Sequence, residues 1–486
     1  MDSEQRSFVE TFRTFLEEVV YVTVQESGLT PLGGLVQEYL GVDIATLPAV
    51  TETIAGHRLI DAHIALEHLA ARGDSRLVGV THGQMRWQED LPGLLTSRVP
   101  FAPGPVDYAS VAAGPDSERQ VVTVGLRMLE VDGNRVALLQ RSARPDFGQE
   151  HARIEVLAAS PDIASAVIHE IRELMIRLSV LRGQVLSLIG NEYGQGAAGA
   201  TFLARPTVTA EEIVLAEGVL EQVRRHVVGI GAQRARLTAA GQHLKRGVLL
   251  YGPPGTGKTL TVRHLLASTP GTTAVLLTGA SIRFITEAAE LARAMQPAIV
   301  VLEDVDLVAG DRSMHGGPQP LLFAVLDALD GLDGDADVTF LLTTNRVELL
   351  ERALAERPGR VDLAVEIGLP GAAERRRLFA LYARALPLSA EVVEAAADQA
   401  DGVTGSFAKE LMRRAVLTAA EQSREVTDAD LQASLEDLLS ARETLTRSML
   451  GGPGPGSGHG SGGDAVHYSA GYGGPMSSSL TIEPSD

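Results

Sequence analysis

The sequence predicts an α/β fold: a parallel sheet with helices on both faces, a helical lid after it and a separate α+β domain before it. Three observations support this prediction. Apolar, β-prone runs alternate with helical patterns from about 205 to 368, as expected for parallel strands joined by helices. Residues 369–445 show helical patterns alone. Residues 1–200 mix helical stretches with paired β-prone runs.

The N-terminal 200 residues are expected to form one domain without a catalytic motif. Apolar runs on both sides of Asp132-Gly133 predict a hairpin, because this dipeptide favours the tight turn that joins two strands. Its histidines are scattered and are interpreted as structural. The expected elements are helices over 4–27, 55–72 and 160–181, a hairpin over 119–140, a strand over 152–158 and a hinge or linker at 190–200.

The second half is expected to hold an α/β domain at 205–368 and a small helical domain at 369–445. The predicted helices of the latter cover 372–384, 389–400, 405–422 and 428–445. The glycine- and serine-rich stretch 451–486 is predicted to be a disordered tail, since it offers too little apolar area to fold. It lacks a C-terminal hydrophobic-Tyr-X signature, so docking on a protease by that route is not predicted.

Residues 247–262, GVLLYGPPGTGKTLTV, contain a phosphate-binding loop (P-loop). An apolar strand leads into the pattern G-x-x-x-x-G-K-[ST], and a helix follows, which is the context this motif requires. Backbone N–H groups, the helix N-terminus and Lys258 are suited to bind phosphates, and the Thr259 hydroxyl is suited to ligate Mg²⁺. The chain is therefore predicted to bind a nucleoside triphosphate. The predicted contact residues are Gly252, Pro253, Pro254, Gly255, Thr256, Gly257, Lys258, Thr259 and Leu260.

Two further apolar strands end in polar residues. AIVVLEDVD at 298–306 carries Glu303 and Asp304 at its end, and TFLLTTN at 339–345 ends in Asn345. Ligands of parallel α/β sheets bind at the carboxyl ends of the strands, so these acids are predicted to lie beside the metal and the attacking water. We expect Thr259 and Glu303 to hold Mg²⁺. The alternative is a core strand whose terminal charges are merely solvated.

Five segments occur in the order and spacing of AAA ATPases, and residues 205–445 resemble that family. They are GPPGTGKT (252–259), LEDVD (302–306), TTN (343–345), ALAERPGRVD (353–362) and GVTGSFAKEL (402–411). The resemblance implies ATP hydrolysis with Glu303, Asp304 and Asn345 at the site. It also implies that Arg357 and Arg360 act on the ATP of a neighbouring subunit, so that a homo-oligomeric ring, commonly a hexamer, is expected. The alternative for both arginines is a surface loop that binds nearby acids.

Three features depart from the family pattern. The acids stand in the order Glu303-Asp304, whereas most members have Asp-Glu. In this order the chain resembles the subfamily that includes the mitochondrial translocase of folded Rieske protein. A shorter base makes slower hydrolysis or a shared role for Glu303 conceivable, but we favour a competent enzyme. Residues 276–293 lack the aromatic-hydrophobic-Gly triplet of threading unfoldases, and Phe284 is expected to be in the core. Lys409 is expected on a solvated helix face.

Composition restricts the partners. Acidic residues outnumber basic ones by 62 to 42, which gives a net charge of −20. This charge argues against nucleic-acid binding, because affinity for nucleic acids depends on clustered Lys and Arg side chains. The chain has no cysteine, no long uncharged apolar stretch and no N-terminal signal pattern, so we expect a cytoplasmic protein without membrane insertion. The predicted function is ATP-driven remodelling of a protein partner that residues 1–200 recognise. The rival is a slow nucleotide-dependent switch or scaffold; a DNA-processing helicase is disfavoured.

Overall fold

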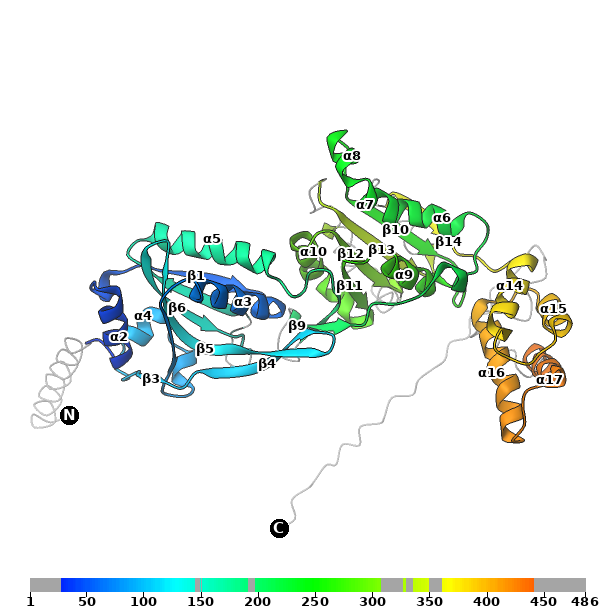
Figure 1. Cartoon of the computed structure of the whole chain (residues 1–486), viewed down its shortest axis with the longest axis horizontal. Helices are drawn as coiled ribbons and strands as arrows, with labels where there is room; N and C mark the ends of the chain where they lie inside the picture. The colour runs from blue at the N-terminus through cyan, green and yellow to red at the C-terminus, as the bar shows by residue number, and fades with distance from the viewer. Residues whose placement is uncertain are drawn as a thin grey trace, which may run out of the picture.

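The computed structural model describes residues 28–144, 149, 151–190, 197–306, 327–328, 335–348 and 361–440. Three bodies follow one another along the chain: an N-terminal domain, a sheet domain and a small helical domain (Figure 1). The predicted helix at 4–27, the predicted tail at 451–486, Arg357 and Arg360 lie outside the described residues.

The N-terminal domain is built on an antiparallel sheet with helices on both faces (Figure 1). Its strand order is β1-β7-β6-β5-β2-β3, and β4 also pairs with β5. The strands are β1 (Ala49–Ile54), β2 (Ser75–Val80), β3 (Pro103–Gly104), β4 (Asp107–Gly114), β5 (Ser117–Val131), β6 (Asn134–Arg141) and β7 (Ala152–Leu157). The helices are α2 (Pro31–Leu40), α3 (Leu59–Ala70), α4 (Leu91–Thr96), α5 (Pro161–Arg177) and the short η1 (Ile44–Thr46), η2 (Gly56–Arg58) and η3 (Met85–Trp87).

Side chains of the central strands alternate between the two faces of the sheet, and each face has its own hydrophobic core. Leu138 packs in the cluster formed with α3 and α5, whereas its neighbour Leu139 packs in the cluster formed with α2 and α4. Successive side chains of a strand point to opposite faces, so a strand that is apolar on both faces must be covered twice. The predicted hairpin is confirmed: Asp132 and Gly133 join β5 to β6 with φ angles of 47° and 78°.

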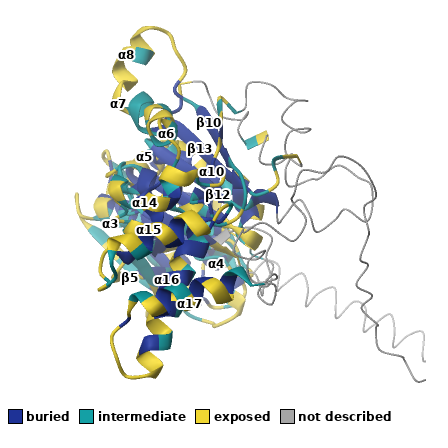
Figure 2. Cartoon of the chain, turned by 90° about the vertical axis from the view of Figure 1, so that its right-hand side faces the viewer, coloured by how far each residue is buried: buried dark blue, intermediate teal, exposed yellow. Residues whose placement is uncertain are grey.

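The sheet domain contains a second, mostly parallel sheet. Its order is β14-β10-β13-β12-β11-β8-β9, with only β9 antiparallel to its neighbour. Figure 2 shows β10 and β13 as buried strands between helices with exposed outer faces. The strands are β8 (Val185–Gly190), β9 (Ala197–Leu203), β10 (Arg246–Tyr251), β11 (Thr273–Thr278), β12 (Ala298–Glu303), β13 (Val338–Thr344) and β14 (Leu363–Glu366). The helices are η5 (Ala210–Glu212), α6 (Val219–Arg224), η6 (Arg225–Gly229), α7 (Ile230–Ala232), α8 (Arg234–Ala239), α9 (Lys258–Ala267), η7 (Gly279–Phe284) and α10 (Ile285–Ala294).

The sheet domain begins earlier than residue 205, where the sequence predicts its start. Strand β8 pairs in parallel with β11, and β9 pairs with β8, so both strands belong to the second sheet. The end of the predicted linker at 190–200 is therefore part of β9. The apolar run of β8 follows α5 directly along the chain, and a local pattern does not reveal which sheet such a strand joins.

The small helical domain agrees with the predicted elements. Its helices are α14 (Ala372–Ala383), α15 (Ala390–Gln399), α16 (Gly405–Glu421) and α17 (Asp428–Leu439). They enclose a core of their own, in which Phe379 and Phe407 are fully buried. Thr404 caps α16 by accepting a hydrogen bond from the Phe407 N–H, which fixes the start of this helix.

A buried carboxylate joins the N-terminal domain to the strand that follows it. Asp61 on α3 accepts hydrogen bonds from Arg58 Nε at 3.0 Å, from Ser179 Oγ at 2.9 Å and from the Val180 N–H at 3.3 Å. Burial raises the pKa of Asp61. Arg182 then donates to the carbonyl oxygen of Gln296 at 2.8 Å, ahead of β12. The domain joint is therefore held by specific polar contacts as well as by chain continuity.

His57, beside this joint, predicts a pH dependence of stability. Its side chain is 6% exposed, and burial together with the Arg58 charge lowers its pKa from 6.5 to about 4. The unfolded chain therefore binds a proton that the folded chain excludes between pH 6.5 and 4, so stability falls as pH falls through this window. We expect His57 to contribute a loss of up to about 3 kcal/mol.

Urea denaturation at pH 7.0 and pH 4.5 measures this effect as a difference between variants. His57→Phe should lose less stability on acidification than the unsubstituted chain. His169→Gln is the control, because the His169 side chain is 72% exposed. Equal acid sensitivity of His57→Phe and the unsubstituted chain would contradict the prediction.

Candidate active site

A cavity of about 480 Å³ lies at the carboxyl ends of β10, β12 and β13, between the sheet domain and the helical domain. The segments that follow these three strands supply the P-loop, Asp304 and Asn345. The remaining walls come from the segment before α6 and from α14 and α16. Its lining residues are Glu212, Ile213, Val214, Leu215, Pro254, Gly255, Thr256, Gly257, Lys258, Thr259, Leu260, Arg263, Asp304, Asn345, Leu378, Tyr382, Gly405, Ser406 and Lys409.

The P-loop adopts a conformation that depends on glycine. Gly252 has φ 142°, and a Cβ there would lie 2.2 Å from the carbonyl oxygen of Ile367. Gly255 has φ 78°, and its carbonyl oxygen accepts a hydrogen bond from the Ser406 N–H on α16 at 3.2 Å. Backbone in this left-handed region without a Cβ can curl closely around an anion. The loop therefore meets both the β14 end and the helical domain.

Lys258 begins α9 with its ammonium group turned back over the loop. Its Nζ donates to the carbonyl oxygens of Gly252 at 2.7 Å and Pro253 at 2.8 Å. Burial lowers the pKa of Lys258, while the nearby Asp304 and Asp306 carboxylates act in the opposite direction. A buried cation at a helix N-terminus is suited to bind phosphate oxygens.

The two acids at the end of β12 face different partners. The Thr259 hydroxyl hydrogen-bonds to the Glu303 carboxylate, and Asp304 Oδ1 accepts from Asn345 Nδ2 at 3.2 Å. Burial, and then the Asp304 charge, raise the pKa of Glu303. Asp304 itself has φ 52°, an uncommon value outside glycine that aspartate tolerates better than most residues. Its N–H donates to Thr343 Oγ1 at 3.0 Å, which holds the turn in place.

The donor set at this point is compatible with Mg²⁺. The Thr259 hydroxyl and the Glu303 carboxylate are adjacent oxygen donors, and Asp304 lies next in the chain. Mg²⁺ at phosphate sites is usually held by one or two protein oxygens together with phosphate and water oxygens. The described residues contain no group of three or more His, Asp or Glu side chains that would form an all-protein metal site.

Asp306 is a site residue that the sequence reasoning did not single out. Its Oδ1 accepts from Thr344 Oγ1 at 2.9 Å and from the Asn345 N–H at 3.0 Å, and its side chain is buried. It therefore fixes the backbone from which Asn345 reaches Asp304. The signal available in the sequence was that the LEDVD segment carries a third acid, two positions after Asp304.

Replacing Asp306 with Ala should reduce ATP turnover about tenfold and destabilise the fold by about 1–3 kcal/mol, because two buried donors lose their acceptor. Steady-state ATPase rates and urea midpoints measure the two effects. Asp335→Ala is the matched control, since Asp335 is exposed in the turn before β13. Unchanged turnover in Asp306→Ala would show that Asn345 does not depend on this contact.

The cavity also has an apolar part of its lining, which the sequence reasoning missed. Ile213, Val214 and Leu215 line it together with Tyr382 from α14, whose pKa burial raises. The only sign of this apolar lining in the sequence is that three consecutive apolar residues interrupt the otherwise polar stretch before α6. Such a surface is suited to cover a planar base.

The structure also places Phe284 and Lys409, for which the sequence analysis predicts a core position and a solvated helix position. Phe284 is 2% exposed and packs in the core of the second sheet, which confirms the prediction that it is a core residue. Arg283 is exposed, with its guanidinium carbon 4.7 Å from the centroid of that ring. Lys409 is exposed on α16, as predicted, but it also lines the cavity, so it is more than a solvated helix residue.

Within the part of the chain that the structure describes, no helix has the length and apolarity to cross a membrane. The predicted site residues Glu303, Asp304 and Asn345 converge with the P-loop, as described above. Arg357 and Arg360 lie outside the described residues, so their roles remain predictions.

Comparison with known proteins gives consistent matches. The family model of the "ATPase family associated with various cellular activities (AAA)" matches residues 248–369. Proteasome-activating nucleotidase 2 of Haloferax volcanii is 30% identical over 286 residues, which cover 55% of this chain and 68% of that protein. The proteasome-activating nucleotidase of Methanothermobacter thermautotrophicus is 31% identical over 277 residues, covering 53% and 67%. ATP-dependent zinc metalloprotease FtsH 1 of Conexibacter woesei is 28% identical over 272 residues, covering 53% of this chain and 41% of that protein.

Proposed function

The chain belongs to the AAA ATPase family, and from that premise we propose that it forms a ring in which ATP hydrolysis remodels a protein partner bound by the N-terminal domain. The cavity that joins the P-loop, the β12 acids, Asn345 and the helical domain carries this proposal. The nucleotidase relatives, whose names refer to proteasome activation, are consistent with action on proteins.

Each residue has a chemical task in this proposal. Lys258 and the loop N–H groups bind the phosphates, and Ile213, Val214 and Tyr382 cover the base. Thr259 and Glu303 hold Mg²⁺, which offsets phosphate charge when it is bound. Asp304 accepts a proton from the attacking water, and Asn345 orients that carboxylate and the water.

We propose that the helical domain moves in response to ATP hydrolysis. Ser406 on α16 contacts Gly255 of the P-loop, and Leu378, Tyr382 and Lys409 line the same cavity. Loss of the γ-phosphate would change the contacts across this cavity and favour a different angle between the two domains. In a ring, Arg357 and Arg360 of each subunit would complete the ATP site of its neighbour.

One observation argues against threading of a partner through a pore, and it also fits the second candidate function, a switch or scaffold that binds partners without threading them. The only aromatic side chain of residues 276–293 is Phe284, and it is buried in the core. Where threading unfoldases present a gripping aromatic group, this chain presents Arg283. We therefore propose remodelling by movement of the N-terminal domains rather than aromatic threading through a pore.

Affinity capture with a hydrolysis-blocked chain tests the proposal. Glu303→Gln combined with Asp304→Asn should trap a protein partner in the presence of ATP and release it when ADP replaces ATP. ATPase rates of Asp304→Asn provide a second measurement, with a large decrease expected. Fast turnover in Asp304→Asn would mean that Asp304 is not the base. If the native chain hydrolyses ATP normally but the blocked chain captures no protein in an ATP-dependent way, remodelling of a protein partner is rejected.

A further inference from the structure

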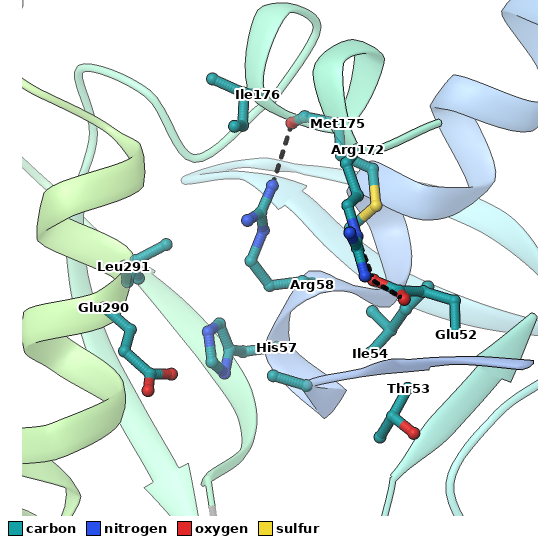
Figure 3. A pocket seen from close by; sticks show the side chains of 11 residues that line it. Glu52, Thr53, Ile54, His57, Arg58, Arg172, Met175, Ile176, Glu290 and Leu291 are labelled. Carbon is teal, nitrogen blue, oxygen red and sulfur yellow. Dashed lines mark hydrogen bonds and ion pairs between the residues drawn. The ribbon is translucent and has the colours of Figure 1, made fainter. Parts of the chain in front are cut away.

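A second cavity, of about 290 Å³, lies where the N-terminal domain meets the sheet domain. It shares no lining residue with the nucleotide cavity. In Figure 3, His57, Arg58 and Arg172 from the N-terminal domain lie on one side, and Glu290 and Leu291 on α10 of the sheet domain lie on the other. A molecule in this cavity would touch both domains at once.

The two positive charges at the cavity are already neutralised. Arg172 makes two hydrogen bonds with the Glu52 carboxylate, at 2.7 and 2.6 Å. Arg58 donates Nε to the buried Asp61 carboxylate and Nη2 to the carbonyl oxygen of Met175 at 3.1 Å. Paired in this way, neither guanidinium leaves a net positive charge to attract an anion.

The negative charge of Glu290 has no such compensation. Glu290 is exposed at the cavity, and among the described residues it has neither an ion pair nor a hydrogen bond. Glu52 is paired with Arg172 within the lining, and Arg58 is paired with Asp61, which lies behind the lining, so Glu290 is the charged lining residue that no ion pair neutralises. The cavity therefore favours a cation.

His57 supplies an unused polar atom next to this charge. Its Nδ1 is buried and has no hydrogen-bond partner in the described structure, a situation that costs free energy unless a ligand provides one. Burial lowers the pKa of His57 to about 4, so the ring is neutral at pH 7. A neutral imidazole has one nitrogen that accepts a hydrogen bond.

The other walls are apolar. Met175 and Leu291 are buried, and Ile176, which is 39% exposed, stands at the opening. We propose that the cavity binds an alkylammonium group, with its N–H donors directed to His57 and Glu290 and its methylene chain against Met175, Ile176 and Leu291. This chemistry is shared by a free alkylamine and by the lysine side chain of a peptide. Because the group bridges the domains, its binding holds α10 and the N-terminal domain together.

The absence of cysteine from the chain allows a direct test. Ile176→Cys places a single thiol at the cavity opening, and its rate of reaction with uncharged methyl methanethiosulfonate is measured in the full chain. Butylammonium chloride should slow the reaction with a saturable dependence on concentration. Butan-1-ol, its uncharged analogue, should not protect. Sodium chloride keeps the ionic strength equal throughout.

Glu290→Gln, combined with Ile176→Cys, should raise the concentration for half-protection about tenfold or more, which corresponds to loss of about 1.4 kcal/mol. Glu287→Gln is the matched control, since Glu287 lies on the same helix but does not line the cavity. Protection by Nα-acetyl-lysine methylamide as well as butylammonium would identify a peptide side chain as an acceptable source. Protection by butylammonium alone would identify a free amine.

Protection that does not saturate, that butan-1-ol reproduces, or that Glu290→Gln leaves unchanged would overturn the proposal. If Ile176→Cys fails to fold, thermal unfolding of chains without this substitution decides. Butylammonium chloride should then raise the midpoint of the native chain and of Glu287→Gln relative to sodium chloride, but not that of Glu290→Gln. Equal midpoints in the two salts for the native chain would likewise refute it.

Discussion

Replacing Lys258 with Ala should lower ATP turnover by at least about 100-fold and weaken ATP binding, because the phosphates lose their main cationic contact. Lys258 is the buried residue whose ammonium group closes over the P-loop, with its Nζ 2.7 Å from the Gly252 carbonyl oxygen. No other side chain of the described structure occupies that position. Steady-state phosphate release and binding of a fluorescent ATP analogue measure the two effects.

Lys409→Ala is the matched control for this substitution. Lys409 carries the same charge and lines the same cavity, but it is exposed on α16 and makes no hydrogen bond or ion pair within the described structure. Its loss should therefore cost only a few-fold in turnover, in line with the small contribution of exposed charges. Equal effects of the two substitutions would mean that binding depends on overall charge rather than on the P-loop geometry.

Replacing both Arg357 and Arg360 with Ala should reduce turnover by about 1,000-fold or more, the range found when an arginine finger is removed from a nucleotide hydrolase. ATP binding should be nearly unchanged, because each subunit retains its own P-loop. This combination of lost turnover and retained binding separates the expected role from an ion pair within a surface loop. A surface ion pair would alter stability slightly and turnover hardly at all.

Mixing the two inactive proteins tests whether the arginines act between subunits. A chain without the arginines still has an intact P-loop, and Lys258→Ala still has both arginines. When subunits exchange freely, about a quarter of the interfaces in an equal mixture should combine an intact P-loop with intact neighbouring arginines. Measurable turnover in the mixture, absent from either protein alone, is the expected result. A mixture as inactive as its components would contradict a shared site.

Much of the fold could be predicted because its signals are local. The P-loop, the Asp132-Gly133 hairpin and the helices after residue 369 each have a start, a period and an end that a short stretch of sequence specifies. The domain boundary could not be predicted in the same way. Whether β8 pairs with β7 or with β11 depends on contacts between residues about 90 positions apart, such as Val185 and Ala274.

The candidate site likewise contains residues that local motifs reveal and residues that only tertiary contacts bring into place. Lys258, Thr259, Glu303 and Asn345 occur in recognisable motifs. Asp306 also belongs to such a segment, but its role depends on a tertiary contact with Thr344 and Asn345, and Tyr382 lies in no motif at all. Tyr382 lies more than 120 residues after the P-loop and reaches the cavity only because the helical domain folds back over it. A pattern within α14 gives no indication of that contact.

The extension of the second sheet by β8 has a mechanical consequence. Helix α5 of the N-terminal domain leads through Asp61-bound residues directly into a strand bonded to β11. The N-terminal domain is thus tied to the sheet that carries the nucleotide site by hydrogen bonds and by a paired strand, as well as by the chain itself. If the chain acts as proposed, a small rotation at the ATP pocket would be carried through this connection and enlarged at the far end of the N-terminal domain.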